Sequence, residues 1–272
     1  MPTGTLYVVA TPIGNLEDMT FRAVRTLREV DLIACEDTRQ TRKLLDHYDI
    51  RTGALSYHDH NEASRTTDLL NRLEAGQNIA LVSDAGTPLL SDPGYRLVHA
   101  AVAANIPVVP IPGASAALSA LAAAGLATDE FRFCGFLPPK SGQRRKTLEA
   151  VADESATLIF YEAPHRILET LEDIEAVYGP REVVVARELT KLHEEFLRGT
   201  AKEIHEKLAA RPAVKGEITL LIGKGEPIAD TTPIPEAVAA LEAQGIPRMD
   251  AIKLVAKARG LSKRDVYKEV SE

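Results

Sequence analysis

Hydrophobic and polar positions alternate along residues 6–111 as short apolar runs separated by amphipathic segments. The apolar runs are bounded by polar or turn residues, as is typical of buried strands, and fall at 6–10, 32–35, 79–82 and 108–111. The segments between them have helical spacing: Thr20, for example, precedes Phe21, Val24 and Leu27 on one helical face. This alternation predicts a parallel sheet with helices on both faces.

The pattern changes after the Pro112-Gly113 turn. Further strands are predicted at 131–136, 157–161, 182–186, 196–198 and 218–222, with helices ending near Ala152 and spanning 201–210. The segment EPIADTTPIP, residues 226–235, contains three prolines and is typical of a linker. We therefore predict two α/β domains, residues 1–113 and 114–226, and a small helical module at 227–272.

Within the module, the spacing predicts helices at 235–243 and 250–259. After Gly260, Ser262 is expected to cap a third helix. Two short helices joined by a glycine-bearing turn resemble a helix-turn-helix unit, although other helical hairpins have the same periodicity.

The segment LVSDAGTPLLSDPG, residues 81–94, is the strongest candidate for a ligand site. It begins as a buried strand and breaks into a turn; Asp92-Pro93 is predicted to cap and begin the next helix. Backbone N–H groups and a helix dipole converge where a strand leads through a glycine-bearing loop into a helix, so open α/β sheets bind ligands there. An ordinary connection without a ligand is the alternative.

Composition places the chain among soluble, cytoplasmic proteins. Of the 272 residues, 45% are hydrophobic and 26% are charged. The N-terminal residues lack the basic and apolar regions of a signal peptide. The nearly charge-free stretch from residue 98 to 128 is interrupted by Pro107, Pro110 and Pro112, which argues against a membrane span. Cys35 and Cys134 are expected to be reduced thiols.

Positive charge is concentrated in two segments although the net charge is −7. Residues 138–147, which are predicted to form a loop, contain four Lys or Arg and no acid. Residues 244–268 contain seven Lys or Arg against two Asp. These segments carry +4 and +5, so the remaining residues carry −16. Such clustering indicates a local anionic partner, with solvated surfaces as the alternative.

Several common catalytic patterns are absent from the sequence: GxGxxG after a strand, GxxxxGK[ST], HExxH, CxxC and GxSxG. The cluster His58-Asp59-His60 with Glu62 is interpreted as a turn and helix cap, and no metal is predicted. The glycine- and proline-bearing turns at strand ends instead suit an adenosine-type ligand held mainly by backbone atoms.

Six ordered motifs carry a resemblance to a known family: LYVVATPIGNLEDMTFRA, ACEDTR, LVSDAGTPLLSDPG, PIPGASA, FYEAPHR and ARELTKLHEE. Together they span about residues 5–225, and the chain resembles the RNA-methylating branch of the tetrapyrrole-methylase superfamily. The resemblance implies two α/β domains of the class III methyltransferase type with a small helical C-terminal module, and a homodimer. It also implies S-adenosylmethionine as cofactor and methylation of the ribose 2′-hydroxyl of a cytidine in the decoding region of 16S ribosomal RNA, in the small ribosomal subunit.

By motif position, the resemblance implies a set of cofactor-binding residues: Pro12, Ile13, Gly14, Asp84, Gly86, Thr87, Leu90, Ser115, Ala116 and Ala163. The chain reads Gly86-Thr87-Pro88 where tetrapyrrole enzymes usually have Gly-Asp-Pro. It also has Ala10-Thr11-Pro12 in place of Gly-x-Gly. These departures leave no side-chain carboxylate at Thr87, and they fit the RNA branch better than the corrin branch.

A ribose hydroxyl is a poor nucleophile that needs positioning and a base. The candidate bases are Glu36, Asp37, His58 and Glu188; each could equally be a helix cap or ion-pair partner, and positioning alone could suffice. The candidate contacts to RNA phosphates are Arg39, Lys43, Arg144, Arg145, Lys146, Arg166 and Lys191. Two alternative functions remain: a corrin-type tetrapyrrole methyltransferase, and a non-catalytic sensor of an adenosine ligand that docks on RNA.

Overall fold

The computed structural model describes residues 2–225, 232–259 and 261–271. The chain divides into two compact units, Met1–Lys224 and Gly225–Glu272. Most of the predicted linker at 226–235, and the predicted turn residue Gly260, lie outside the described residues. The first unit holds two five-stranded sheets. We call residues 6–111 the first half and residues 116–222 the second half; the division between domains at residue 113 stays a prediction.

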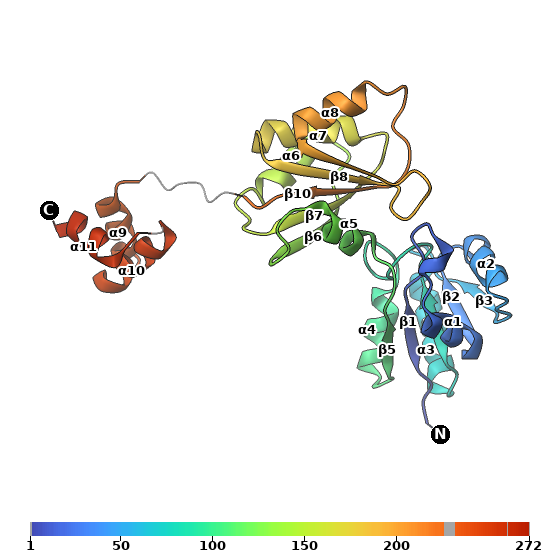
Figure 1. The fold of residues 1–272 in the computed structure, drawn as a ribbon. Coiled ribbons are helices and arrows are strands. Elements are labelled where there is room, and N and C mark those ends of the chain that lie inside the picture. The colour runs from blue at the N-terminus through green and yellow to red at the C-terminus, as the bar shows by residue number, and fades with distance from the viewer. Residues whose placement is uncertain (1, 226–231, 260, 272) are drawn as a thin grey trace. The chain divides into compact units, whose positions relative to one another are not determined.

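The first half contains an all-parallel sheet of five strands in the order β3-β2-β4-β1-β5 (Figure 1). Its strands are β1 (Leu6–Val9), β2 (Leu32–Cys35), β3 (Ala54–Ser56), β4 (Ile79–Val82) and β5 (Val108–Ile111). The four predicted strands are confirmed. The sequence did not reveal β3, because this three-residue edge strand is partly exposed and has no continuous apolar run.

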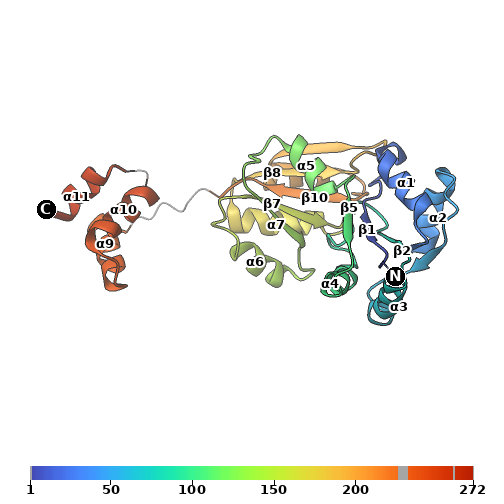
Figure 2. The ribbon, with the colours of Figure 1, turned by 90° about the horizontal axis from the view of Figure 1, so that it is seen from below.

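Helices cover both faces of this sheet, as predicted (Figure 2). The helices are α1 (Phe21–Glu29), α2 (Thr38–His47), α3 (Glu62–Glu74) and α4 (Tyr95–Ala103). Helices α1 and α2 bury Leu27 and Leu45 against one face, while α3 and α4 bury Leu69 and Leu97 against the other. The Thr20 cap of α1 is confirmed, since its hydroxyl accepts a hydrogen bond from Ala23 N at 3.1 Å.

The predicted start of α4 at Asp92-Pro93 is wrong. The helix begins at Tyr95, after Gly94, whose φ of +133° strongly favours glycine. Leu89 and Ser91 also have positive φ angles, of +74° and +65°. Because consecutive right-handed helical residues cannot adopt these angles, the chain stays in a loop through Asp92 and leaves its carboxylate free of a capping role.

The second half contains a mixed sheet in the order β6-β7-β10-β8-β9, in which β6 and β7 are parallel and the other pairs antiparallel. Its strands are β6 (Phe131–Phe136), β7 (Thr157–Glu162), β8 (Glu182–Arg187), β9 (Glu195–Thr200) and β10 (Ile218–Ile222). One face packs on α6 (Ser141–Glu149), α7 (Ile167–Tyr178) and α8 (Ala201–Ala209), and the other on α5 (Ala116–Ala124).

The basic segment at residues 138–147 is largely helical rather than the predicted loop, and it contains a buried ion pair. Arg144 is fully buried, and its Nε donates to Asp173 Oδ2 at 2.6 Å. Arg145 and Ser141 donate to the other carboxylate oxygen, Oδ1. Burial alone would raise the pKa of Asp173, but these hydrogen bonds lower it below its ordinary value. The prediction that Arg144 contacts RNA phosphates is therefore wrong: its guanidinium joins α6 to α7.

Replacing Arg144 by Ala is expected to lower the free energy of unfolding by about 3 kcal/mol, because it leaves the buried Asp173 short of a partner. Lys146→Ala, an exposed change on the same helix, should alter it by less than about 0.5 kcal/mol. Urea denaturation of both variants measures the difference. Equal stability of the two would contradict a structural role for Arg144.

The C-terminal unit contains α9 (Ile234–Ala243), α10 (Arg248–Ala258) and α11 (Lys263–Ser271). These helices surround a core of their own that includes Val238, Ile252 and Val266. The predicted Ser262 cap is confirmed, because its Oγ accepts from Asp265 N at 3.1 Å. Among the described residues of the whole chain, no helix is long and apolar enough to cross a membrane.

Candidate functional site

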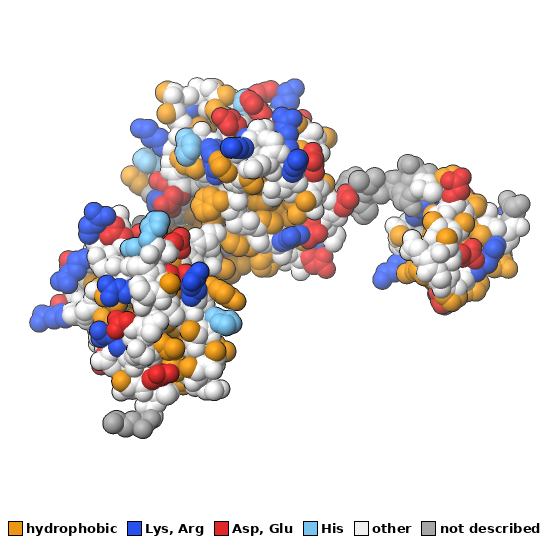
Figure 3. All heavy atoms as spheres, turned by 180° about the vertical axis from the view of Figure 1, so that it is seen from behind, with side chains coloured by type: hydrophobic (Ala, Val, Ile, Leu, Met, Phe, Trp, Pro, Cys, Tyr) orange, Lys and Arg blue, Asp and Glu red, His pale blue; other side chains and the backbone are white. Residues whose placement is uncertain are grey.

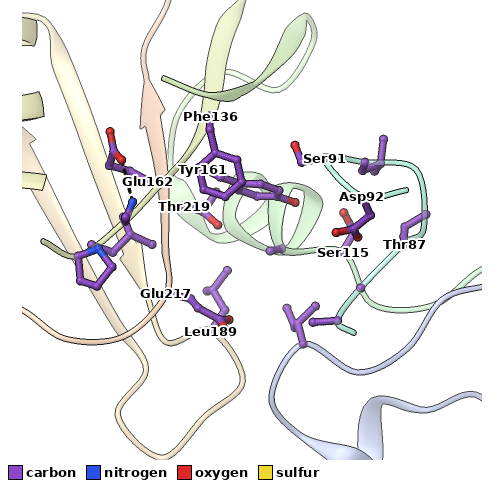
Figure 4. Close-up of a pocket in the computed structure, with 18 residues that line it drawn as sticks. Thr87, Ser91, Asp92, Ser115, Phe136, Tyr161, Glu162, Leu189, Glu217 and Thr219 are labelled. Carbon is purple, nitrogen blue, oxygen red and sulfur yellow. Dashed lines mark hydrogen bonds between the residues drawn. The ribbon is translucent and has the colours of Figure 1, made fainter. Parts of the chain in front are cut away.

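A cavity of about 410 Å³ opens where the carboxyl ends of β1 and β4 face the second half (Figure 4). This volume is in the usual range for a small-molecule site. The first half contributes Ile13 and the loop residues Ala85, Gly86, Thr87, Leu90, Ser91 and Asp92. The second half contributes Phe136, Leu189, the segment 161–164 and the segment 217–219, and Ser115 and Ala116 lie at the start of α5.

Two backbone hydrogen bonds join the loops after β1 and β4 beneath the cavity. Thr11 N donates to Gly86 O at 2.9 Å, and Gly86 N donates to Thr11 O at 3.0 Å. Gly86 has a φ of +81°, and a Cβ there would lie 3.2 Å from Ile13 Cγ2. The glycine therefore permits both the turn and the close approach of the two loops, and it presents backbone rather than side chain to the cavity.

The N-terminus of α5 also opens on the cavity. Ser115 caps this helix, and Thr87 Oγ1 donates to Ala114 O at 3.2 Å, which ties the β4 loop to the start of the helix. The first N–H groups of a helix carry a partial positive charge and have no partner within the helix. This edge of the cavity is suited to a carboxylate or another small anion.

The wall formed by the second half is aromatic and apolar. The rings of Phe136 and Tyr161 meet edge to face with centroids 5.6 Å apart, and burial raises the pKa of the Tyr161 phenol. Below them, Glu162 accepts hydrogen bonds from Ala163 N, Arg166 Nε and Thr170 Oγ1 at 2.7–2.9 Å. Glu162 thus holds the turn after β7, while the ring faces suit a flat heterocycle.

Seven of the ten predicted cofactor residues line this cavity: Ile13, Gly86, Thr87, Leu90, Ser115, Ala116 and Ala163. Pro12, Gly14 and Asp84 do not. Asp84 Oδ1 accepts from Asp37 N at 3.1 Å. A Cβ on Gly14 would lie 2.4 Å from Lys191 Cγ, so this glycine serves the close approach of the two halves. Its neighbour Asn15 caps the 3₁₀ turn Leu16–Asp18, and Asn15 N donates to Thr190 Oγ1.

Asp92 lines the cavity and was missed as a site residue, because the Asp-Pro pair was interpreted as a helix cap. Burial raises the pKa of its carboxyl to about 6; the Ser83 hydroxyl offsets part of the rise, and Asp84 and Asp59 add to it. In the part of the chain that the structure describes, no cation forms an ion pair with Asp92. The sequence signal was the pair of acids, Asp84 and Asp92, that flank the glycine turn.

None of the four predicted bases lines the cavity. Burial, followed by repulsion from Asp84 and Asp92, raises the pKa of Glu36. Asp37 caps α2, and the hydrogen bond from Arg39 lowers its pKa to about 2. His58 Nε2 lies 3.2 Å from the Asn61 amide nitrogen. Glu188 accepts from Lys191 Nζ and Glu217 N, both at 3.0 Å.

The residues predicted to contact phosphates differ in whether their side chains are held in ion pairs at the cavity wall or are exposed to solvent. Arg166 pairs with Glu162, and Lys191 with Glu188 and Glu217, so both cations hold turns at the cavity wall. These pairs favour a structural role over phosphate binding. Exposed cations remain at Arg39, although it pairs with Asp37, and at Lys43, Arg145 and Lys146. The described residues contain no cluster of three or more His, Cys, Asp or Glu that could hold a metal ion.

Comparison with known proteins places this architecture in a family. The family model for tetrapyrrole (corrin/porphyrin) methylases matches residues 5–205. The chain belongs to this family. It is 52% identical to ribosomal RNA small subunit methyltransferase I of Halalkalibacterium halodurans, with 97% of this chain and 93% of the relative covered. The protein of the same name from Synechocystis is 51% identical, with 97% and 96% covered.

Solved structures of the tetrapyrrole methylases share the fold at low sequence identity. Uroporphyrin-III C-methyl transferase from Thermus thermophilus, complexed with S-adenyl homocysteine, superposes with a TM-score of 0.56 at 18% identity, covering 80% of this chain and 97% of the other. A diphthine synthase superposes with a TM-score of 0.60 at 12% identity, covering 81% and 90%. These likenesses confirm the predicted methylase fold.

Replacing Asp92 by Asn is expected to stabilise the protein at pH 8. A raised pKa means that the folded state disfavours the ionised carboxylate. The resulting loss of stability is absent below about pH 4, grows as the pH rises toward about 6, and is complete above that pH. A rise of the Asp92 pKa from its ordinary value to about 6 would cost about 3 kcal/mol in a fully buried site, and partial exposure reduces this to about 1 kcal/mol.

Urea denaturation at pH 4 and pH 8 tests this prediction. Asp37→Asn is the matched control, because the pKa of Asp37 is lowered and the sign at pH 8 should reverse. Destabilisation of the protein by Asp92→Asn at pH 8 would contradict the prediction.

Proposed function

We propose that this protein transfers a methyl group from S-adenosylmethionine to ribosomal RNA of the small subunit. The observation that carries the proposal is the 52% identity to a ribosomal RNA small subunit methyltransferase I over 97% of the chain. The motif resemblance extends the proposal to the ribose 2′-hydroxyl of a cytidine in the decoding region of 16S RNA. The cavity between the two halves is where we place the reaction.

The residues of the cavity fit such a cofactor. The start of α5 at Ser115 and Ala116 would hold its carboxylate, and the Gly86–Thr87 backbone would line its amino-acid portion. Apolar contacts from Ala163, Leu189 and Ile218 suit the adenine ring. When bound, the cofactor supplies an electrophilic methyl group on a sulfonium sulfur, so the chain needs only to position the nucleophile and receive its proton.

An RNA nucleotide must leave its helical stack to enter this cavity. Phe136 lies at the cavity wall with 56% of its surface exposed, and its ring offers a stacking surface for an unstacked base. Exposed cations at Lys43, Lys140 and Lys146 would contact phosphates outside the cavity.

The proposed enzyme is a homodimer. Figure 3 shows hydrophobic side chains gathered on the surface of the second half. Outside the cavity, the exposed apolar residues of this half include Leu118 on α5 and Phe131 on the edge strand β6. An exposed edge strand with an aromatic side chain is a surface that a second copy would cover.

Methylation of a tetrapyrrole is the second candidate, since the family is defined by such enzymes. Incubation with methyl-labelled cofactor and, separately, small ribosomal subunits, naked 16S RNA and a precorrin separates the candidates. We expect label in RNA and none in the precorrin. Label only in the precorrin would support the second candidate, and binding of cofactor without any transfer would support a non-catalytic sensor.

Gly86→Asp is expected to weaken S-adenosylmethionine binding at least tenfold, about 1.4 kcal/mol, because it puts a charged side chain where backbone lines the cavity. Gly125→Asp is the matched control: Gly125 has nearly the same φ, +82° against +81°, but lies outside the cavity with open space around it. Calorimetry showing equal affinity for folded Gly86→Asp and wild type would remove this loop from the cofactor site.

Ending the chain after Gly225 is expected to leave a folded protein that still binds S-adenosylmethionine, because the C-terminal unit has its own core and the cavity lies in residues 13–219. Methylation of small subunits should then weaken mainly through a higher KM, since the +5 segment at residues 244–268 would raise the local concentration of RNA. Loss of both thermal stability and cofactor affinity would instead identify the unit as a structural cap.

A further inference from the structure

Three acids line the cavity, and two of them already have partners. Glu162 is almost fully buried, and its two oxygens accept from Arg166 Nε, Thr170 Oγ1 and Ala163 N. Glu217 pairs with Lys191, Oε2 to Nζ, at 3.0 Å. The oxygens of a carboxylate engaged by cations and N–H groups are already occupied, so fewer of their lone pairs can contact a ligand. For the third acid, Asp92, the described residues provide no such cation.

The backbone around Asp92 directs this residue toward the cavity, and its side chain also interacts with the Ser83 hydroxyl. Leu89 and Ser91 adopt positive φ angles on the approach, a conformation that costs free energy and persists only where the surroundings enforce it. After Asp92, Gly94 N donates to Glu62 Oε1 at 3.3 Å. Glu62 is in turn held by Tyr57 Oη at 3.1 Å and by an ion pair with Arg96.

This anchoring network runs from Tyr57, just after β3, through Glu62 on α3 to Arg96 on α4, and all three residues lie outside the cavity lining. It fixes the end of the loop while the Asp92 carboxylate remains available to a ligand. In Figure 4 the carboxylate lies beside Ser115 and across from Tyr161, within the space that both halves enclose. A group with this placement is close to anything bound between the Gly86 loop and the aromatic wall.

We propose that Asp92 is the catalytic base that accepts the proton of the attacking ribose hydroxyl; this inference rests on the proposed function. The hydroxyl oxygen forms a bond to the methyl carbon as the carbon–sulfur bond breaks and its electron pair passes to sulfur. The hydroxyl proton passes to the Asp92 carboxylate and then to solvent. The products are the methyl ether, the neutral thioether and a released proton, so charge and atoms balance.

The surroundings of Asp92 suit this role. Four titratable groups interact electrostatically with the Asp92 carboxylate: Glu36, Asp59 and Asp84 from the first half and Tyr161 from the second. Burial is the main cause that disfavours the ionised form, and repulsion from Asp84 and Asp59 adds to it. Together they raise the pKa of Asp92 to about 6 and make its carboxylate a stronger base than an isolated aspartate. At neutral pH it is still mostly ionised. The rate is therefore expected to fall about tenfold per pH unit below pH 6.

The test compares full-length wild type with Asp92→Asn, Asp92→Glu and Asp59→Asn in single-turnover methylation of small subunits. Asp59 is an exposed acid that raises the pKa of Asp92 but does not line the cavity. We expect Asp92→Asn to lower the rate at saturating substrate by about 100-fold or more, as loss of a general base does. Cofactor affinity by calorimetry should change less than twofold, and Asp92→Glu should recover part of the rate.

The pH profile separates a base from a structural residue. Asp59→Asn should keep the wild-type rate at pH 8. Because it removes a charge that repels the ionised carboxylate, the fall in rate at acid pH should begin at a lower pH than in wild type. The rate of Asp92→Asn should not show this fall. A rate for Asp92→Asn within a few-fold of wild type, or a loss of cofactor affinity as large as the loss of rate, would overturn the inference. Wild type that methylates no RNA in this assay would refute the proposed function instead, and the inference with it.

Discussion

The paired backbone of Thr11 and Gly86 is the contact on which the candidate site depends. Its two hydrogen bonds, 2.9 and 3.0 Å long, join the loops that leave two adjacent parallel strands, β1 and β4. Because the loops are joined by backbone, Ile13 and Gly86 both face the cavity and the segment from Thr87 to Asp92 is directed toward the second half. The left-handed conformation of Gly86 makes this join possible.

Several cations of the second half pair with acids at positions that hold the fold together. Arg144, Arg166 and Lys191 satisfy acids that hold helices and turns together. These pairs stabilise ionised carboxylates and fix the second half around its mixed sheet. Among the described residues no cation pairs with Asp92, and burial together with the neighbouring acids disfavours its ionisation. The same protein thus contains acids that serve the fold and one whose ionised form lowers stability, as is common at functional sites.

Central strands could be predicted where they contain a continuous buried apolar run, as β4 and β10 do. β3 could not, since three partly exposed edge residues carry no such signal. The cofactor loops followed from motifs, and seven of their ten residues line the cavity. Local sequence could not show that Arg144 is buried, because its partner Asp173 lies on another helix. Nor could local sequence show that the Asp92 carboxylate does not cap a helix. An Asp-Pro pair is also a common helix start, and the positive φ angles before it are set by tertiary packing.

We propose that this cavity directs a methyl group to a ribose hydroxyl of small-subunit RNA. Mass spectrometry of nucleosides from small subunits incubated with methyl-labelled cofactor and this protein tests this proposal. We expect a single labelled nucleoside, 2′-O-methylcytidine, located in a fragment of 16S RNA from the decoding region. Label on a base, on another nucleoside, or absent from RNA in the presence of bound cofactor would contradict it.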